Sequence, residues 1–198
     1  MNLSRYFFTT IRETPSDAST SSHIFLIRGG YIKALSTGIY SFLPMGLRVM
    51  QKLETLIRKE MNNIGGLEVD LPVVQTKELW QESNRYSDIG EELLRFKDRN
   101  EHPMVLAMTH EEAVTDMARY VLSSYKQLPF MLYQFKVKYR DEARARGGLI
   151  RVREFLMKDA YSFHSSSESL DIHYKEQYDA YIRIFNAVGI EPIVVESD

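Results

Sequence analysis

The chain has 198 residues, of which 44% are apolar and 26% charged, a composition typical of a globular domain with a sizeable core. It has no cysteine, which excludes disulfides, thiolate zinc sites and a cysteine nucleophile, and no apolar run reaches the ~20 residues of a membrane helix. The formal net charge is −2, yet residues 136–153 hold seven basic and two acidic side chains, which predicts a focused site for an anionic ligand.

The N-terminal segment gives no sign of a targeting sequence. Residues 1–11 lack an apolar stretch followed by a small-residue cleavage site, and the acidic residues Glu13 and Asp17 follow early. We therefore expect a cytoplasmic protein. Residues 14–22 are rich in serine and threonine, which is typical of a polar loop or the start of a helix.

Two segments with different periodicity come next. Apolar residues recur at spacings of three and four over residues 44–64, which predicts a helix, and Gly65 with Gly66 favours a left-handed stop. Residues 67–75 alternate apolar side chains and predict a strand. Because Pro72 cannot donate to a sheet ladder, we expect this strand at an edge or an interface.

A short strand and a helix are expected in the middle of the chain. Residues 103–108 are apolar and predict a strand. Thr109 and Glu112 match the T-x-x-E pattern of a capping box, so a helix is expected to begin at Thr109. Its buried stripe would contain Ala113, Met117 and either Tyr120 or Val121.

A hairpin is expected in the second half. Polar and apolar side chains alternate over residues 130–142 and again over residues 149–157, with a loop at residues 143–148 between them. If the two strands pair, one face of the hairpin presents Arg140, Glu142, Arg151 and Phe155, with Arg153 beside them.

The chain ends with a predicted helix and the start of a strand. Ser165 and Glu168 form a second capping-box pattern, and Gly189 closes the helix. Along it the helix carries Leu170, Tyr174, Tyr178, Tyr181 and Phe185. A strand would begin at residues 193–195 and stop at Asp198, so we expect that more sequence follows. Strand pairs mixed with separate helices predict an α+β fold, an antiparallel sheet flanked by helices.

Several known site motifs are absent. The sequence contains no P-loop, no G-x-G-x-x-G, no G-x-S-x-G and no H-E-x-x-H. No histidines are paired at metal-ligand spacing, so no metal site is assigned to protein side chains. The histidines expected at the surface or at helix caps are His23, His102, His164 and His173.

The residues on the hairpin face suit a nucleotide. Arginine binds phosphate oxygens through two parallel hydrogen bonds, an aromatic ring stacks on a base, and a carboxylate accepts from an exocyclic amine. The alternative is an ordinary charged face in solvent, with Phe155 in the core.

The segments that carry these residues resemble motif 2 of class II aminoacyl-tRNA synthetases. They read Tyr-Arg-Asp-Glu at 139–142 and Arg-Val-Arg-Glu-Phe-Leu-Met-Lys-Asp-Ala-Tyr-Ser-Phe at 151–163. Further segments that resemble this family are residues 40–46 and 68–75, which are similar to motif 1, and residues 79–83 and 109–112. The resemblance covers nearly the whole chain, and the motif residues are most similar to those of the bacterial-type prolyl-tRNA synthetases.

The resemblance implies an antiparallel catalytic core that uses ATP and Mg²⁺ to activate proline as prolyl-adenylate and then transfers the prolyl group to tRNA. Arg140 would be the catalytic residue, at the α-phosphate and the proline carboxylate. ATP would be bound by Arg140, Glu142, Arg151 and Phe155, and proline by Thr109, Glu111 and Arg140. Phe155 would stack on the adenine, Glu142 would contact ATP near the adenine, and Arg151 would reach the γ-phosphate. Arg144 and Arg146 would guide the tRNA acceptor end, Pro72 would lie at a homodimer interface, and no membrane partner is implied.

The sequence departs from the family in places. The family usually has Gly-Pro where Ala107 and Met108 stand, and its loop usually has a proline and an aromatic ring that residues 144–148 lack. A looser loop would weaken acceptor-end binding. Helix capping alone also explains Thr109, and His110 is expected to be structural.

Motif 3, the editing domain and the anticodon-binding domain of the family are not found in residues 1–198. We therefore expect the N-terminal portion of a catalytic domain, incomplete at its C-terminus and weak or inactive alone. Two hypotheses remain open: a proline–tRNA ligase fragment, and a non-enzymatic truncated paralogue that binds nucleotide or the tRNA acceptor end.

Overall fold

The computed structural model describes residues 5–7, 9–16 and 18–196. The expectations that used residues 1–4, Asp17 and Asp198 therefore fall outside the described residues. The helices are α1 (Ser21–Arg28), α2 (Pro44–Asn63), α3 (Lys77–Glu82), α4 (Arg85–Asp88), α5 (Glu111–Val121) and α6 (Ser167–Ala187), with a 3-10 helix at Tyr125–Gln127. The strands are β1 (Ile32–Ser36), β2 (Ile39–Phe42), β3 (Gly66–Glu68), β4 (Val74–Thr76), β5 (Arg95–Lys97), β6 (Pro103–Leu106), β7 (Phe130–Tyr139) and β8 (Glu154–Phe163).

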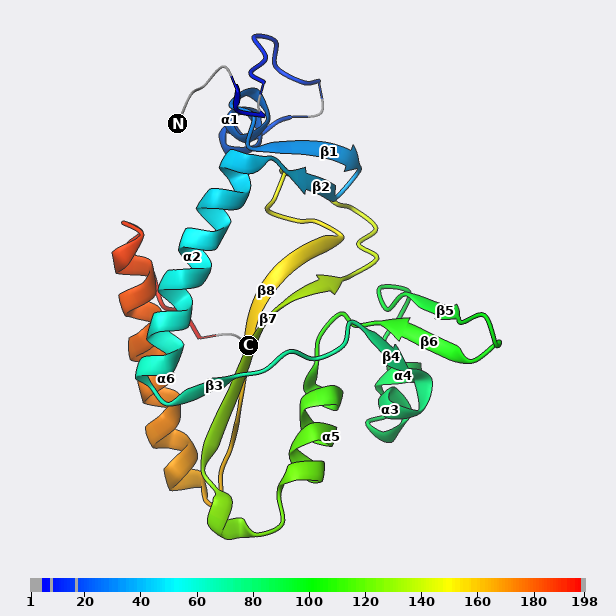
Figure 1. Cartoon of the computed structure of the whole chain (residues 1–198), viewed down its shortest axis with the longest axis vertical. Helices are drawn as coiled ribbons and strands as arrows, with labels where there is room; N and C mark the ends of the chain where they lie inside the picture. The colour runs from blue at the N-terminus through cyan, green and yellow to red at the C-terminus, as the bar shows by residue number, and fades with distance from the viewer. Residues whose placement is uncertain (1–4, 8, 17, 197–198) are drawn as a thin grey trace.

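A long hairpin, β7–β8, forms the centre of the structure (Figure 1). The two strands pair antiparallel without a break, from Phe130 opposite Phe163 to Tyr139 opposite Glu154. The short strand β3 joins β7 on its other side and runs parallel to it. The predicted α+β class is confirmed, with this one parallel pair as a departure from an all-antiparallel sheet.

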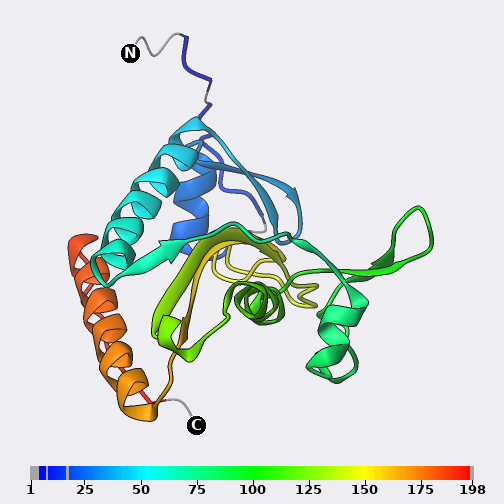
Figure 2. The ribbon, with the colours of Figure 1, turned by 60° about the horizontal axis from the view of Figure 1, so that its bottom comes forward.

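Helices cover both sides of the hairpin. Figures 1 and 2 show α2 and α6 side by side along one side of it and α5 on the other. The first side packs around Met61, Met131, Tyr133, Ala180 and Ile184. The second packs around Leu71, Ala113, Val114 and Leu132. Burial of these apolar side chains is the main favourable term that holds the helices to the hairpin.

The helix predicted over residues 44–64 is confirmed as α2, which ends at Asn63. Gly65 has a φ of 79°, the left-handed conformation that glycine adopts without strain. Gly66 allows a close approach, since a Cβ there would lie 2.9 Å from the Met61 carbonyl oxygen and 2.3 Å from the end of the Met131 side chain. The chain can therefore pass directly from α2 into β3 against the hairpin.

The single strand predicted over residues 67–75 is wrong. The segment forms two short strands in different sheets, β3 beside β7 and β4 beside β6. Between them the backbone N–H of Leu71 donates to the side chain of Gln134 instead of to a ladder. Pro72 lies in this crossing segment, and both short strands are at sheet edges, as the proline predicted.

A second sheet, in the order β4–β6–β5, projects from the end of the hairpin, where the Tyr139 N–H donates to the Ala107 carbonyl over 3.1 Å, and α3 and α4 lie against it (Figure 1). Its core contains Trp80, Leu93 and Val105. The strand predicted at residues 103–108 is confirmed as β6, although it ends at Leu106. A third, two-stranded sheet, β1–β2, lies near α1 and was not predicted.

Both predicted capping boxes are wrong. Helix α5 begins at Glu111, and no side chain caps it, because the hydroxyl of Thr109 donates to Glu111. Glu112 is buried against Ser83 and Arg85 and is not available to the helix start. Helix α6 is capped one residue later than expected, by Ser166, which accepts from the backbone N–H of Ser169.

The buried stripe predicted for α5 is confirmed at Ala113, which is buried, and at Met117, which packs against the second core cluster, but is wrong at its last position. In α5 the buried residues are Glu112, Ala113, Val114 and Ala118, whereas Tyr120 and Val121 are exposed. In α6 only Ala180 and Ile184 are buried, and the exposed side chains include Leu170, Tyr174, Tyr178, Tyr181 and Phe185. The residues 193–195 form no strand. Within the described residues, no helix is both long and apolar enough to span a bilayer.

Candidate functional site

Arg140 stands where the central hairpin ends. Its backbone N–H donates to the carbonyl of Arg153 over 2.8 Å, just beyond the last pair of β7 and β8. Its guanidinium carbon lies 5.4 Å from the ring centre of Phe155, and its Nε donates to the carbonyl of Met108 over 3.4 Å. In the described part of the chain, nothing else binds this guanidinium. Its outer nitrogens are thus available to an anion.

Phe155 belongs to the open end of the hairpin and not to the core. It pairs with Lys138, so it projects on the same face as Arg140. The ring is partly buried and lies outside the three core clusters. The alternative of a core phenylalanine is therefore not supported.

The predicted second strand begins later than expected. Strand β8 starts at Glu154, so Arg151 and Arg153 precede it and their placement does not follow from strand alternation. Arg151 is held by an isolated backbone bridge to Arg146. Its Nε lies 2.7 Å from Glu142 Oε2, and Arg153 Nε donates to the Glu142 carbonyl over 3.0 Å. The expected group is therefore assembled, but partly by a loop.

Glu142 is fully engaged by its own loop. Oε1 accepts from the backbone N–H of Arg144 over 2.9 Å, while Oε2 faces Arg151. The hydrogen bond from Arg151, followed by that from Arg144, lowers the pKa of Glu142 below its ordinary value. Here Arg151 and Glu142 neutralise one another, so a nucleotide would have to share or replace this ion pair.

The loop between the strands carries the two arginines expected to meet RNA. Arg144 and Arg146 are both exposed. Gly148 has a φ of 65°, and a Cβ there would lie 2.8 Å from Cγ of His23. The loop therefore packs closely on helix α1 through a glycine.

The expected location of the histidines is wrong in part. His23 is buried, only 2% exposed, where it meets the loop and the ring of Tyr40. His164 and His173 are partly buried and pack together, with ring centres 5.4 Å apart. His102 is exposed, as expected. No group of three or more His, Cys, Asp or Glu among the described residues is arranged to hold a metal ion.

The two residues expected to bind the amino-acid ammonium lie together at the start of α5. The hydroxyl of Thr109 donates to Glu111 Oε2 over 2.5 Å, and Arg85 Nη1 approaches the same oxygen at 3.2 Å. Burial by itself raises the pKa of Glu111. The hydrogen bonds from Thr109, from the Glu111 backbone and from Arg85 together outweigh burial, so the pKa lies below its ordinary value. Met108, which binds Arg140, directly precedes this turn.

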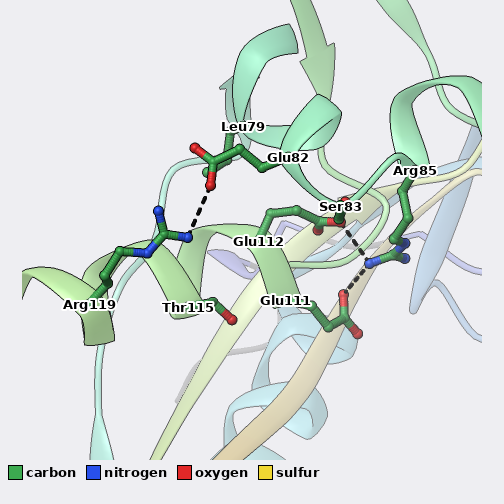
Figure 3. Close-up of a pocket in the computed structure, with 8 residues that line it drawn as sticks. All are labelled: Leu79, Glu82, Ser83, Arg85, Glu111, Glu112, Thr115 and Arg119. Carbon is green, nitrogen blue, oxygen red and sulfur yellow. Dashed lines mark hydrogen bonds and ion pairs between the residues drawn. The ribbon is translucent and has the colours of Figure 1, made fainter.

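A cavity of about 300 Å³ opens beside Glu111, between α5 and the α3–α4 segment (Figure 3). It is lined by Leu79, Glu82, Ser83, Arg85, Glu111, Glu112, Thr115 and Arg119. Arg85 was not singled out from the sequence. Its position in the helical segment after Trp80 gave no signal, because its partners are 26 and 27 residues away.

Behind the Thr109–Glu111 turn lies a buried polar network that the sequence did not indicate. Lys138 is fully buried and donates to Nδ1 of His110 and to Oδ2 of Asp159, the latter over 2.9 Å. Asp159 Oδ2 also accepts from Gln134 over 2.9 Å and from the hydroxyl of Tyr161 over 2.6 Å. Three donors, one of them the charged ammonium of Lys138, thus meet on one oxygen of Asp159.

The network ties the turn to the crossing segment and to the hairpin. The backbone N–H of His110 donates to the Tyr161 hydroxyl over 3.2 Å, and its Nε2 donates to the carbonyl of Pro72 over 3.1 Å. Burial, followed by the charge of Lys138, lowers the pKa of His110 to about 4, so the ring is neutral. Burial also lowers the pKa of Lys138, against the opposing effect of Asp159. Burial and Asp159 raise the pKa of Tyr161.

Pro72 has an exposed side chain, although its carbonyl is used internally by His110 and Gln75. This placement is compatible with a contact to another chain. The dimer interface stays a prediction.

Comparisons with known proteins identify the family and the fold of the chain. The family model described as "tRNA synthetase class II core domain (G, H, P, S and T)" matches residues 94–198, just over half of the chain. The prolyl-tRNA synthetase of Giardia lamblia, solved with prolyl-adenylate, has a TM-score of 0.72 at 22% identity, over 78% of this chain and 33% of that one. The Cryptosporidium parvum prolyl-tRNA synthetase, solved with L-proline and AMP, has a TM-score of 0.72 at 16% identity, over 82% and 32%. At these identities the likeness concerns the fold, and the chain spans about a third of each enzyme.

Proposed function

The chain belongs to the class II tRNA synthetase core family, a family of ligases, and we propose from this premise that it serves proline–tRNA ligation. Two structural relatives were solved with prolyl-adenylate or with L-proline and AMP, which supports proline and ATP as its substrates. The proposal that residues 1–198 are the N-terminal portion of a catalytic domain rests on the share of those enzymes that the chain covers. The proposal that the chain is of the bacterial type rests on the amino-acid sequence of the motif 2 segments.

In this proposal ATP lies against the open end of the β7–β8 hairpin. The adenine stacks on Phe155, close to Glu142, and the α-phosphate meets the free nitrogens of Arg140. Arg151 gives up its ion pair with Glu142, or keeps it in part, and binds the γ-phosphate. Stacking on an aromatic ring contributes about 1–3 kcal/mol, and a charge-assisted hydrogen bond about 1.5–3 kcal/mol.

Proline occupies the neighbouring turn. Its secondary ammonium binds Glu111 and Thr109, and its carboxylate points toward Arg140. Arg140 contacts both Phe155 and the Met108 carbonyl, so one guanidinium lies between the nucleotide side and the amino-acid side. This is the single observation that carries the proposal.

The reaction then needs fixed positive charge more than a base. A proline carboxylate oxygen attacks the α-phosphorus, the bond to the bridging oxygen breaks, and pyrophosphate leaves with its electron pair. Negative charge grows on the α-phosphate in the transition state, where Arg140 stabilises it without any rearrangement of solvent. A terminal ribose hydroxyl of tRNA next attacks the carbonyl of prolyl-adenylate, and AMP leaves.

The proposal also includes a metal ion, the tRNA acceptor end and a second copy of the chain. Mg²⁺, if bound, would neutralise charge on the leaving pyrophosphate, and no protein side chain is assigned to it. The exposed arginines Arg144 and Arg146 contact phosphates of the tRNA acceptor end. A homodimer contact at Pro72 and a cytoplasmic location complete the proposal.

Proline-dependent exchange of pyrophosphate into ATP tests the function. We expect exchange by the chain when the remainder of a prolyl-tRNA synthetase catalytic domain is supplied in trans, and little exchange without it. The Arg140→Ala variant is the matched control and should give none. Binding of ATP or RNA with no exchange under either condition would instead support the non-enzymatic paralogue.

A further inference from the structure

One guanidinium is shared by two successive carboxylates beside the cavity of Figure 3. Arg85 Nη1 lies 3.0 Å from Glu112 Oε1 and 3.2 Å from Glu111 Oε2. The Glu112 side chain is 3% exposed and that of Glu111 is 52% exposed. Arg85 therefore faces a buried acid and a half-exposed acid at once, and none of the motifs described above includes it.

The surroundings of Arg85 hold it in place. Its guanidinium carbon lies 5.2 Å from the ring centre of Trp80, which is fully buried and donates its indole N–H to Gln75. Asn84, with a φ of 62°, turns the chain from α3 into α4 and so places Arg85 over this ring. If the guanidinium moved away, the buried carboxylate of Glu112 would lose its cation, which is strongly unfavourable.

This arrangement fixes the orientation of Glu111. Thr109 and Arg85 both donate to Oε2, and no side chain of the described residues donates to Oε1. A carboxylate held by one oxygen presents the other in a fixed direction. Binding an ammonium there costs less conformational entropy than binding it to a freely rotating side chain.

Arg85 also screens Glu111 from its neighbour. Glu112 accepts a hydrogen bond from Ser83 on Oε1, while its buried Oε2 has no hydrogen-bond partner among the described residues. Without Arg85, two adjacent carboxylates would face one cavity with no cation bridging them. Like charges at this distance shift toward protonation or move apart.

We infer that Arg85 is a positioning residue that, through its bridge to Glu112, presents Glu111 Oε1 to the ammonium of the amino-acid substrate. The inference rests on the proposed function, in which Glu111 binds proline. Arg85 acts through Glu111 and does not itself touch the substrate.

Calorimetric titration of the chain with L-proline, and separately with ATP, tests this role. Arg85→Met should weaken L-proline binding about tenfold or more and leave ATP binding unchanged. Arg85→Lys, which keeps one charged nitrogen, should recover most of the loss. Arg119→Met is the matched control, because Arg119 lines the same cavity but pairs with Glu82, 3.0 Å away. It should change L-proline binding less than about twofold.

A second variant keeps the test decisive if Arg85→Met does not fold. Arg85→Met combined with Glu112→Gln removes the buried charge together with its partner, so the interior is not left with a lone ion. The same loss of L-proline affinity is expected. Unchanged L-proline affinity in either variant would overturn the role of Arg85 alone. If the unmodified chain binds ATP but not L-proline, the proposed function fails, and this inference fails with it.

Discussion

The substitution Lys138→Met would leave the carboxylate of Asp159 in the interior without its cation. Lys138 is fully buried, the Asp159 side chain is 10% exposed, and Nζ lies 2.9 Å from Oδ1 as well as from Oδ2. Methionine keeps most of the apolar stem, so little packing is lost. The free energy of unfolding should fall because the remaining ion stays desolvated while its attraction to Nζ is gone.

The magnitude follows from what remains on Asp159. Removing one partner of a buried ion pair costs about 3–5 kcal/mol. Gln134 and Tyr161 still donate to Oδ2, so we expect the lower end, about 3 kcal/mol. With an m-value of about 2 kcal/mol/M in urea, the unfolding midpoint should fall by about 1.5 M.

Urea unfolding at pH 7, followed by circular dichroism, measures this loss. The double variant Lys138→Met with Asp159→Asn removes both charges and should regain at least half of the stability. A loss below about 1 kcal/mol in the single variant, or a double variant no more stable than the single one, would refute the reasoning.

Two further predictions concern the histidine of the network and the hairpin loop. The pKa of His110 is lowered to about 4, so the folded chain binds fewer protons than the unfolded chain below pH ~6.5. The contribution of this ring to the unfolding free energy is complete above pH ~6.5 and falls by about 3 kcal/mol as the pH is lowered toward 4. The difference in unfolding free energy between wild type and His110→Asn should shrink over the same pH range. A difference that does not change with pH would contradict this prediction. Arg144→Ala should weaken binding of an acceptor-stem RNA and lower the salt slope by about 1 in fluorescence anisotropy, with ATP affinity unchanged; an unchanged slope would argue against a phosphate contact.

Local periodicity predicted the elements that depend on one long run of residues. Helix α2 and strand β7 both lie close to the ranges that their apolar patterns indicated. The α+β class followed from the order of these elements. The segment around Pro72 shows the limit, because a continuous alternation of apolar residues cannot tell which of two sheets receives each half.

Tertiary partners decided the features that the sequence could not predict. The T-x-x-E pattern at Thr109 is that of a capping box, but Arg85 and Ser83 bind Glu112 from a distant part of the chain. Alternation predicted that the polar residues of β7 share one face of the strand, but it could not show what packs against that face. In the structure, Gln134 and Lys138 both donate to Asp159 on β8 and form a buried network with it.

The candidate site was predicted in part. Alternation along the two strands brought Arg140 and Phe155 to one face, and the structure places them together. Arg151 pairs with Glu142, but it lies in the loop before β8 and not in the strand that the alternation predicted. Arg85 could not be found without the fold, because only the packing of α4 beside α5 brings it to Glu111.

The central claim is that one guanidinium, that of Arg140, serves both the nucleotide and the amino acid. Calorimetry with a non-hydrolysable prolyl-adenylate analogue, together with separate titrations of ATP and L-proline, tests it in wild type and Arg140→Ala. We predict that the variant loses at least about tenfold in affinity for all three ligands. Equal affinity of the two proteins for the analogue would contradict the account.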